Sequence, residues 1–190
     1  MMKKVGILGG TFDPPHIGHF IIADEVKHAL SLDEIWFIPT NEPPHKRQAM
    51  MSNQHRIGML EEVTKEFSYF KVNTIEMERI GKSYTIETVK QLKKRFPMIQ
   101  FYFIIGADMV EYLPHWQEIN ELIKLIQFVG VKRSGYTLST DYPILEVNIP
   151  LIETSSTEIK QRIIEERPIH FFVPEQVYSY IKEHRLYGFK

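Results

Sequence analysis

The sequence predicts an α/β fold, a Rossmann-like doubly wound parallel sheet with helices on both faces. Three observations support this prediction. Short apolar runs alternate with helix-length amphipathic runs along the whole chain, which is the pattern of strands joined by crossover helices. The length of 190 residues fits one domain. The first apolar run leads directly into a loop with two glycines, at the place where such sheets bind ligands.

Each element follows from this alternation. Strands are expected at the short apolar runs, which are Lys4–Leu8, Glu34–Ile38, Tyr69–Val72, Gln100–Ile105, Phe128–Lys132 and Leu145–Val147. Helices are expected at the amphipathic runs, which are Ile17–Leu30, Gln54–Glu66, Tyr84–Arg95, Trp116–Leu125, Thr157–Glu166 and Glu175–His184. Asn41–Ala49 and Ser134–Pro143 are expected to be loops. We expect residues 1–190 to form a single domain, in which the part from about 150 to 190 is helical.

Composition excludes several classes of function. The formal net charge of -1 argues against a large basic surface for duplex nucleic acid. The absence of cysteine excludes disulfides, thiolate catalysis and cysteine-ligated metals. No apolar run approaches the roughly 18 residues of a membrane span, and the start of the chain does not resemble a signal peptide. We therefore expect a cytoplasmic protein that binds neither nucleic acid nor a membrane.

The densest motif is the eleven-residue string Gly9-Gly10-Thr11-Phe12-Asp13-Pro14-Pro15-His16-Ile17-Gly18-His19. The two glycines let the backbone turn tightly and approach a phosphate. The two histidines lie three residues apart at the start of a helix, so they share a face. The N-terminus of that helix adds free N–H groups and partial positive charge. This combination favours the binding of a polyphosphate.

Simpler interpretations of the same residues exist. Glycine is common in strand-to-helix turns, and two histidines at this spacing are also typical of a metal pair or of plain surface residues. A zinc site needs further ligands, for which Asp13 and His45 are candidates without a fixed geometry. A P-loop is excluded, because Glu76 stands where the first glycine of a motif ending in Gly81-Lys82-Ser83 should be. No G-x-G-x-x-G follows the first strand.

The whole string resembles the G-x-F-D-P-x-H-x-G-H signature of the nucleotidyltransferases that carry an HxGH element. This resemblance implies that His16 and His19 contact the phosphates of ATP. It also implies that the preceding loop, Gly9, Gly10, Thr11 and Phe12, lies against them.

A second motif near the end of the chain is Thr154-Ser155-Ser156-Thr157-Glu158. Ser155 and Glu158 have the spacing of a capping box, which taken alone indicates only a well-capped helix. The segment resembles the I-S-S-T-x-[IL]-R element of the same superfamily, and this implies that Ser155, Ser156 and Thr157 bind ATP phosphates. Lys160 stands where arginine is commonest, so both Lys160 and Arg162 are candidates for the phosphate-binding cation.

Three further segments lie between these motifs, namely Pro43-Pro44-His45-Lys46, Ser83-Tyr84-Thr85-Ile86-Glu87-Thr88, and Ile105-Gly106-Ala107-Asp108 with Tyr112 and Trp116. Taken singly they are typical of a solvated loop, a polar helix start and a core aromatic. Together they resemble the nicotinate-nucleotide adenylyltransferases of bacteria. The resemblance implies a pyridine-nucleotide site at Ser83, Tyr84, Thr85, Tyr112 and Trp116. It implies further ATP contacts at Lys46, Ile105, Gly106 and Asp108.

The reaction implied is adenylyl transfer from ATP to nicotinate mononucleotide, which gives deamido-NAD and pyrophosphate. Mg²⁺ is expected to arrive with the triphosphate, without metal ligands from protein side chains. Phosphopantetheine adenylyltransferase and a non-catalytic nucleotide-binding module are the alternatives. The sequence leaves open the choice between nicotinate and nicotinamide mononucleotide. It also leaves open a homodimer through Tyr178, Tyr180, Ile181 and Tyr187, which a core-facing helix explains equally well.

Overall fold

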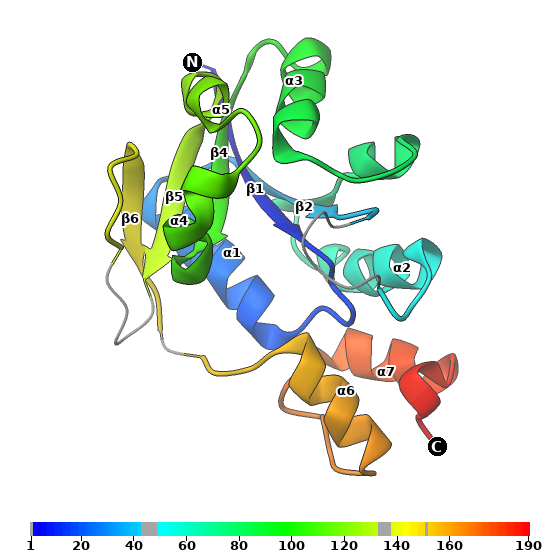
Figure 1. The fold of residues 1–190 in the computed structure, drawn as a ribbon. Coiled ribbons are helices and arrows are strands. Elements are labelled where there is room, and N and C mark those ends of the chain that lie inside the picture. Colours follow the sequence, from blue (N-terminus) through cyan, green and yellow to red (C-terminus); the bar gives the residue numbers. More distant parts are fainter. Residues whose placement is uncertain (1, 43–48, 133–137, 151) are drawn as a thin grey trace.

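The computed structural model describes residues 2–42, 49–132, 138–150 and 152–190. Within these ranges one sheet contains six parallel strands in the order β3-β2-β1-β4-β5-β6 (Figure 1). Their bounds are β1 Lys3–Gly10, β2 Glu34–Pro39, β3 Phe70–Val72, β4 Ile99–Gly106, β5 Gln127–Lys132 and β6 Ile144–Asn148. The doubly wound parallel sheet predicted from the sequence is therefore confirmed.

The strand order reverses at β1. From β1 the chain continues outward to β2 and β3, and then returns to the other side of β1 to form β4, β5 and β6. Because every strand is parallel, the carboxyl ends of β1 and β4, at Gly10 and Gly106, meet at one edge of the sheet. Ligands of such folds bind in the crevice at this switch point.

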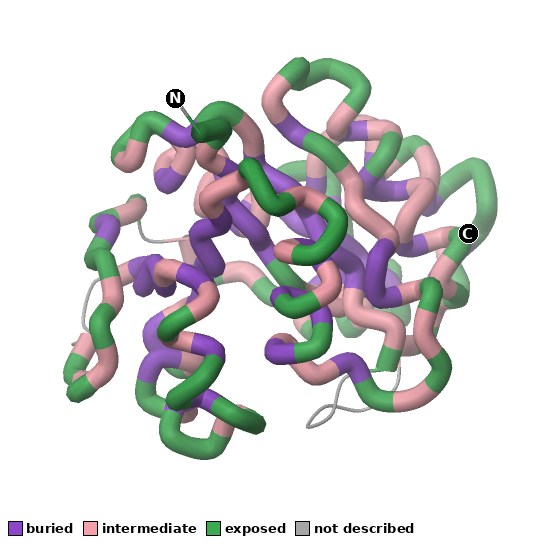
Figure 2. Tube along the Cα trace, turned by 90° about the horizontal axis from the view of Figure 1, so that it is seen from above, coloured by how far each residue is buried: buried purple, intermediate pink, exposed green. Residues whose placement is uncertain are grey.

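Helices cover both faces of the sheet, and the central strands β1, β2, β4 and β5 are buried on both sides (Figure 2). Val5 and Ile7 of β1 belong to an apolar cluster that includes α3 (Thr85–Arg95) and α5 (Ile119–Leu125). Leu8 belongs to a second cluster that includes α1 (Ile17–Ala29) and α2 (Asn53–Thr64). Two-sided burial explains why these strands appear in the sequence as continuous apolar runs.

The last two helices, α6 (Ser156–Ile164) and α7 (Glu175–Glu183), lie beyond the carboxyl edge of the sheet (Figure 1). They share an apolar cluster with α2, to which Met59 and Val63 contribute. Ile181 and Tyr187 are buried within this cluster, so the core-facing interpretation of these two residues is the one that the structure supports. The single-domain organisation of residues 1–190 stays a prediction.

One predicted helix was wrong at its start. Instead of a helix over Trp116–Leu125, the chain forms α4 (Ala107–Tyr112), a 3-10 turn (Leu113–His115) and then α5. Trp116 is extended, and Glu118 adopts the left-handed region with φ 51°. Pro114 belongs to the first turn of the 3-10 segment, where its missing N–H is tolerated. Two further 3-10 turns, Ile75–Glu78 and Leu186–Gly188, were not predicted.

No helix in the described ranges is long and apolar enough to cross a membrane.

Candidate functional site

The loop after β1 is held from the inside by two buried side chains. Phe12 adopts a left-handed backbone with φ 51°, and its buried ring packs edge-on against His19 and Phe37 at 4.9 and 5.9 Å. Arg56, which is fully buried, donates from Nη1 to the carbonyl of Thr11 at 2.6 Å. A Cβ atom on Gly10 would lie 3.1 Å from the Phe12 ring, so this turn favours glycine. Gly9 is exposed on the other side of the turn.

The two histidines form a stacked pair at the start of α1. Their ring centroids lie 3.7 Å apart with an angle of 33° between the planes. The backbone N–H of His16 donates to Nδ1 of His19 at 3.1 Å. An imidazole that accepts at Nδ1 carries its proton on Nε2 when neutral, so Nε2 of His19 is a hydrogen-bond donor. His19 therefore offers an imidazole donor beside the partial positive charge of a helix N-terminus.

The start of α6 lies against the start of α1. Ser156 donates from Oγ to the carbonyl of Pro14 at 2.8 Å, and Ile17 donates its backbone N–H to the carbonyl of Phe172 at 3.0 Å. Ser155 caps α6 by accepting from the N–H of Glu158 at 3.1 Å. Thr157 is exposed in the first turn of the same helix. Two helix N-termini thus converge beside the histidine pair, and together they favour an anion.

Lys160 and Arg162 have different surroundings. Nζ of Lys160 lies 3.2 Å from Oδ2 of Asp13, directly under the loop after β1. Arg162 pairs instead with Glu158 at 3.2 Å, and its guanidinium lies over the Phe172 ring at 4.0 Å. It also donates to the carbonyl of Pro168. Of the two cations proposed from the sequence, the structure brings only Lys160 to the loop after β1.

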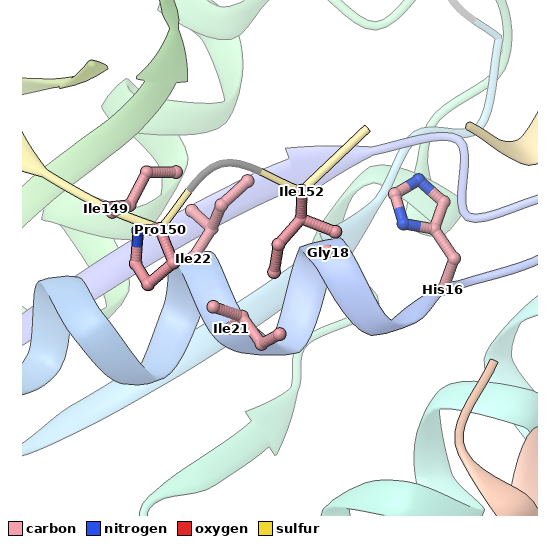
Figure 3. A pocket seen from close by; sticks show the side chains of 7 residues that line it. All are labelled: His16, Gly18, Ile21, Ile22, Ile149, Pro150 and Ile152. Carbon is pink, nitrogen blue, oxygen red and sulfur yellow. The ribbon is translucent and has the colours of Figure 1, made fainter. Parts of the chain in front are cut away.

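A small apolar cavity lies beside the histidine pair (Figure 3). It is lined by His16, Gly18, Ile21 and Ile22 from the start of α1, and by Ile149, Pro150 and Ile152 from the chain that leads to α6. Its free space, about 10 Å³, has room for roughly one water molecule. A Cβ atom on Gly18 would lie 3.1 Å from Nδ1 of His16 and 3.4 Å from Cγ2 of Thr154, so glycine permits this close approach.

The end of β4 lies on the other side of the switch point. Ile105 is buried in the core, and Gly106 precedes the first turn of α4. Asp108 is exposed, and its Oδ1 lies 2.6 Å from the position of a Cβ atom on Gly106. This carboxylate therefore folds back over the end of the strand.

The segment proposed for the pyridine nucleotide begins α3. Tyr84 is the extended N-cap, Thr85 is the first helical residue, and both are half-buried. Ser83 is buried, and its N–H donates to the carbonyl of Glu42 at 2.9 Å. The position of this helix start is thus tied to the chain that follows β2.

A buried polar network contacts the first turns of α3. Thr88 donates from Oγ1 to the buried carboxylate of Glu76 at 2.8 Å, and Arg79 donates to the Thr88 hydroxyl at 2.5 Å. Asn41 donates to the carbonyl of Arg79 at 2.8 Å. Burial raises the pKa of Glu76, and the hydrogen bond from Thr88 only partly offsets this effect.

The two aromatic residues proposed for the pyridine ring are half-buried. The ring of Tyr112 lies 4.9 Å from that of His115. Trp116 packs edge-on against Phe103 and Phe128 with centroids 5.9 and 5.8 Å apart, so part of its surface belongs to the core. Its contact with a ligand stays a prediction.

Lys46 and the Pro43-Pro44-His45-Lys46 motif lie outside the described residues. In the part of the chain that the structure describes, no group of three or more His, Asp or Glu side chains is arranged to hold a metal ion.

Sequence reasoning missed four residues that build the site, which are Asp13, Arg56, Glu76 and Tyr187. A signal existed for Arg56, because the buried positions of α2 are Arg56, Met59, Leu60 and Val63. An arginine on the apolar stripe of a helix indicates a buried partner. The sequence alone presents Asp13 only as a candidate metal ligand. No local pattern points to Glu76 or to the contact of Tyr187 with Asp13.

Known proteins resemble this chain over most of its length. Residues 7–162 match the profile of the family described as cytidylyltransferase-like. The nicotinate-nucleotide adenylyltransferase of Bacillus subtilis is 49% identical over 187 residues, which cover 98% of this chain and 99% of that protein. A probable nicotinate-nucleotide adenylyltransferase of Oceanobacillus iheyensis is 50% identical over 188 residues, which cover 99% of this chain and 98% of that protein.

Solved structures share the fold. The nicotinic acid mononucleotide adenylyltransferase of Plasmodium falciparum complexed with NaAD has a TM-score of 0.81 at 23% identity. The same protein complexed with APC has a TM-score of 0.80 at 23% identity. Both alignments cover 99% of this chain and 98% of the other.

The raised pKa of Glu76 gives a pH-dependent prediction. A carboxyl whose pKa is raised in the folded state stabilises the fold below its ordinary value, here 4.5, and loses that contribution as the pH rises through the raised pKa. Glu76→Gln carries no charge at any pH. We therefore expect the Tm of Glu76→Gln, measured relative to that of the wild type, to be higher at pH 7 than at pH 4.

Glu78 is the matched control, because it is exposed and Arg95 lowers its pKa. The difference in Tm for Glu78→Gln should change with pH in the opposite direction. Thermal unfolding of the three proteins at both pH values measures this. If the relative Tm values of Glu76→Gln and Glu78→Gln changed with pH in the same direction, the raised pKa of Glu76 would be contradicted.

Proposed function

The chain belongs to the cytidylyltransferase-like family, and from this premise we propose that it is a nicotinate-nucleotide adenylyltransferase. It joins the phosphate of nicotinate mononucleotide to the AMP part of ATP, giving deamido-NAD and pyrophosphate. The observation that carries the proposal is the convergence of two helix N-termini, two imidazoles and Lys160 at the switch point of the sheet. Full-length identity of about half to adenylyltransferases supports this substrate pair.

The reaction requires no general base. The attacking group is a phosphate monoester, whose second pKa of about 6 leaves it mostly ionised at neutral pH. The protein has to hold two polyanions in line and stabilise the charge that develops as pyrophosphate leaves. Fixed donors serve this purpose because they do not reorganise during the reaction.

The phosphate site is assigned to the residues around the two helix starts. His16 and His19 donate to the triphosphate, and Ser156 and Lys160 assist from α6. The loop Gly9, Gly10, Thr11 and Phe12 shapes the floor beneath the phosphates. The strand order reverses between β1 and β4, and we assign the entry of the nucleophile to the carboxyl edge of the sheet at this point.

The two nucleosides are assigned to two separate sets of residues. Ile105, Gly106 and Asp108 lie at the end of β4, where Asp108 can accept hydrogen bonds from a ribose or an adenine. Ser83, Tyr84, Thr85, Tyr112 and Trp116 form the proposed pyridine-nucleotide site. Lys46 is proposed to approach the triphosphate from the chain after β2.

Mg²⁺ is proposed to enter with ATP. The donors around the phosphate site are imidazole, hydroxyl, ammonium and N–H groups, which suit phosphate oxygens, whereas Mg²⁺ prefers oxygen ligands. The buried Asp13 carboxylate is occupied by donors from the chain itself. These residues fit an arrangement in which the triphosphate oxygens would be the ligands of Mg²⁺. The ion would then reduce the negative charge of the phosphates.

Replacement of His19 tests the imidazole role. Loss of an oriented donor in such a site typically lowers kcat roughly 100- to 1,000-fold, and we expect this for His19→Ala in a variant that still folds. His28→Ala, at the exposed end of the same helix, is the control and should keep wild-type turnover. Steady-state release of pyrophosphate measures both. Near-normal turnover of His19→Ala would exclude the role.

The choice between the two cations of α6 gives a second test. Lys160→Met should raise the KM for ATP roughly tenfold, because a charged hydrogen bond to phosphate is lost. Arg162→Met should lower Tm through the lost contacts with Glu158 and Phe172, and should leave the KM for ATP near the wild-type value. The opposite pattern would assign the phosphate contact to Arg162.

The substrate is tested by parallel kinetics with nicotinate and nicotinamide mononucleotide. We expect pyrophosphate release with both ATP and nicotinate mononucleotide present, and a higher kcat/KM for nicotinate than for nicotinamide mononucleotide. Activity with 4'-phosphopantetheine instead of either mononucleotide would contradict the proposed function.

A further inference from the structure

The last turn of the chain carries a tyrosine in an unfavourable backbone conformation. Tyr187 has φ 58° and Arg185 has φ 47°, both in the left-handed region that side chains with a Cβ atom disfavour. The Tyr187 side chain is nonetheless buried, with only 4% of the residue exposed. Such a conformation persists only where the surroundings compensate for it, and it points to a specific contact.

That contact is with the phosphate loop. The Tyr187 hydroxyl donates to Oδ1 of Asp13 at 2.8 Å, across 174 residues of sequence. Burial raises the pKa of Tyr187, and the Asp13 charge acts in the same direction, so the hydroxyl stays protonated and donates. The turn therefore places one fixed donor on the carboxylate that lies between the start of α1 and α6.

Asp13 accepts from four donors in the described part of the chain. Oδ1 receives Tyr187 and the N–H of Met51 at 3.3 Å, and Oδ2 receives the N–H of Met50 at 2.8 Å and Nζ of Lys160 at 3.2 Å. Asp13 is 2% exposed. The donors on Oδ1 fix the plane of the carboxylate, and that plane sets the direction in which Oδ2 meets the ammonium group.

We propose that Tyr187 and Asp13 are positioning residues for ATP binding, which together hold the Lys160 ammonium at the triphosphate site. Neither residue touches the substrate. The inference rests on the proposed function of Lys160. The terminal torsion of aspartate is broad, so without the Tyr187 hydroxyl the carboxylate gains rotational freedom and the flexible lysine loses its fixed anchor.

Tyr187→Phe tests this with the removal of a single oxygen atom. Calorimetric titration with ATP alone, in the absence of any mononucleotide, gives the dissociation constant without turnover. We expect the Kd for ATP to rise about fivefold, the effect of one lost hydrogen bond. Tyr178→Phe is the control, because this half-buried tyrosine of α7 packs against His170 and Phe189, away from Asp13. Its Kd should be unchanged.

A double-mutant cycle separates positioning from a merely structural role. In a Lys160→Met background, Tyr187→Phe should no longer change the Kd for ATP, although any loss of Tm should persist. An equal rise in Kd in both backgrounds, or an unchanged Kd in the single variant, would overturn the proposal. The proposed function would be refuted separately, by a wild-type protein that binds ATP but releases no pyrophosphate with nicotinate mononucleotide. The double-mutant cycle would still be valid in that case, because it measures ATP binding alone.

Discussion

The parallel direction of the strands is the constraint on which the site depends. In the described residues every strand of the sheet runs the same way, so all carboxyl ends lie at one edge. The strand order reverses at β1, so β1 and β4 are neighbours, and the helices α1 and α4 follow their carboxyl ends. The fold thus directs two strand ends and their helix starts toward one small volume. The last helices add a third wall, because α6 begins against Pro14.

The need to balance charge explains the presence of Asp13 and Arg56 next to the proposed phosphate site. A site for two polyanions needs positive groups, yet a buried positive group needs a partner. Asp13 provides the negative charge beside Lys160, and Arg56 lies near enough to Asp13 to interact with it electrostatically. Arg56 in turn supports the phosphate loop at Thr11. The motif Asp13-Pro14-Pro15 is therefore the structural base of the histidine pair, and its aspartate acts through its neighbours.

Much of this arrangement could be predicted from the sequence, because it is local. The strands were visible as apolar runs, and the histidines, Ser156 and Gly106 lie in short motifs that keep their geometry within a few residues. The start of α5 was mispredicted, because the left-handed Glu118 breaks a helical pattern that amphipathicity alone extends back to Trp116. The contacts of Asp13 with Tyr187, and of Glu76 with Thr88, join residues far apart in the sequence. Only the folded chain shows them.

The proposed mechanism requires one triphosphate to lie between the starts of α1 and α6. A crystal structure with a non-hydrolysable ATP analogue would locate it. We expect phosphate oxygens within hydrogen-bonding distance of His16, His19, Ser156 and Lys160, with the nucleoside toward Gly106. A triphosphate bound elsewhere, with both helix starts unoccupied, would contradict it.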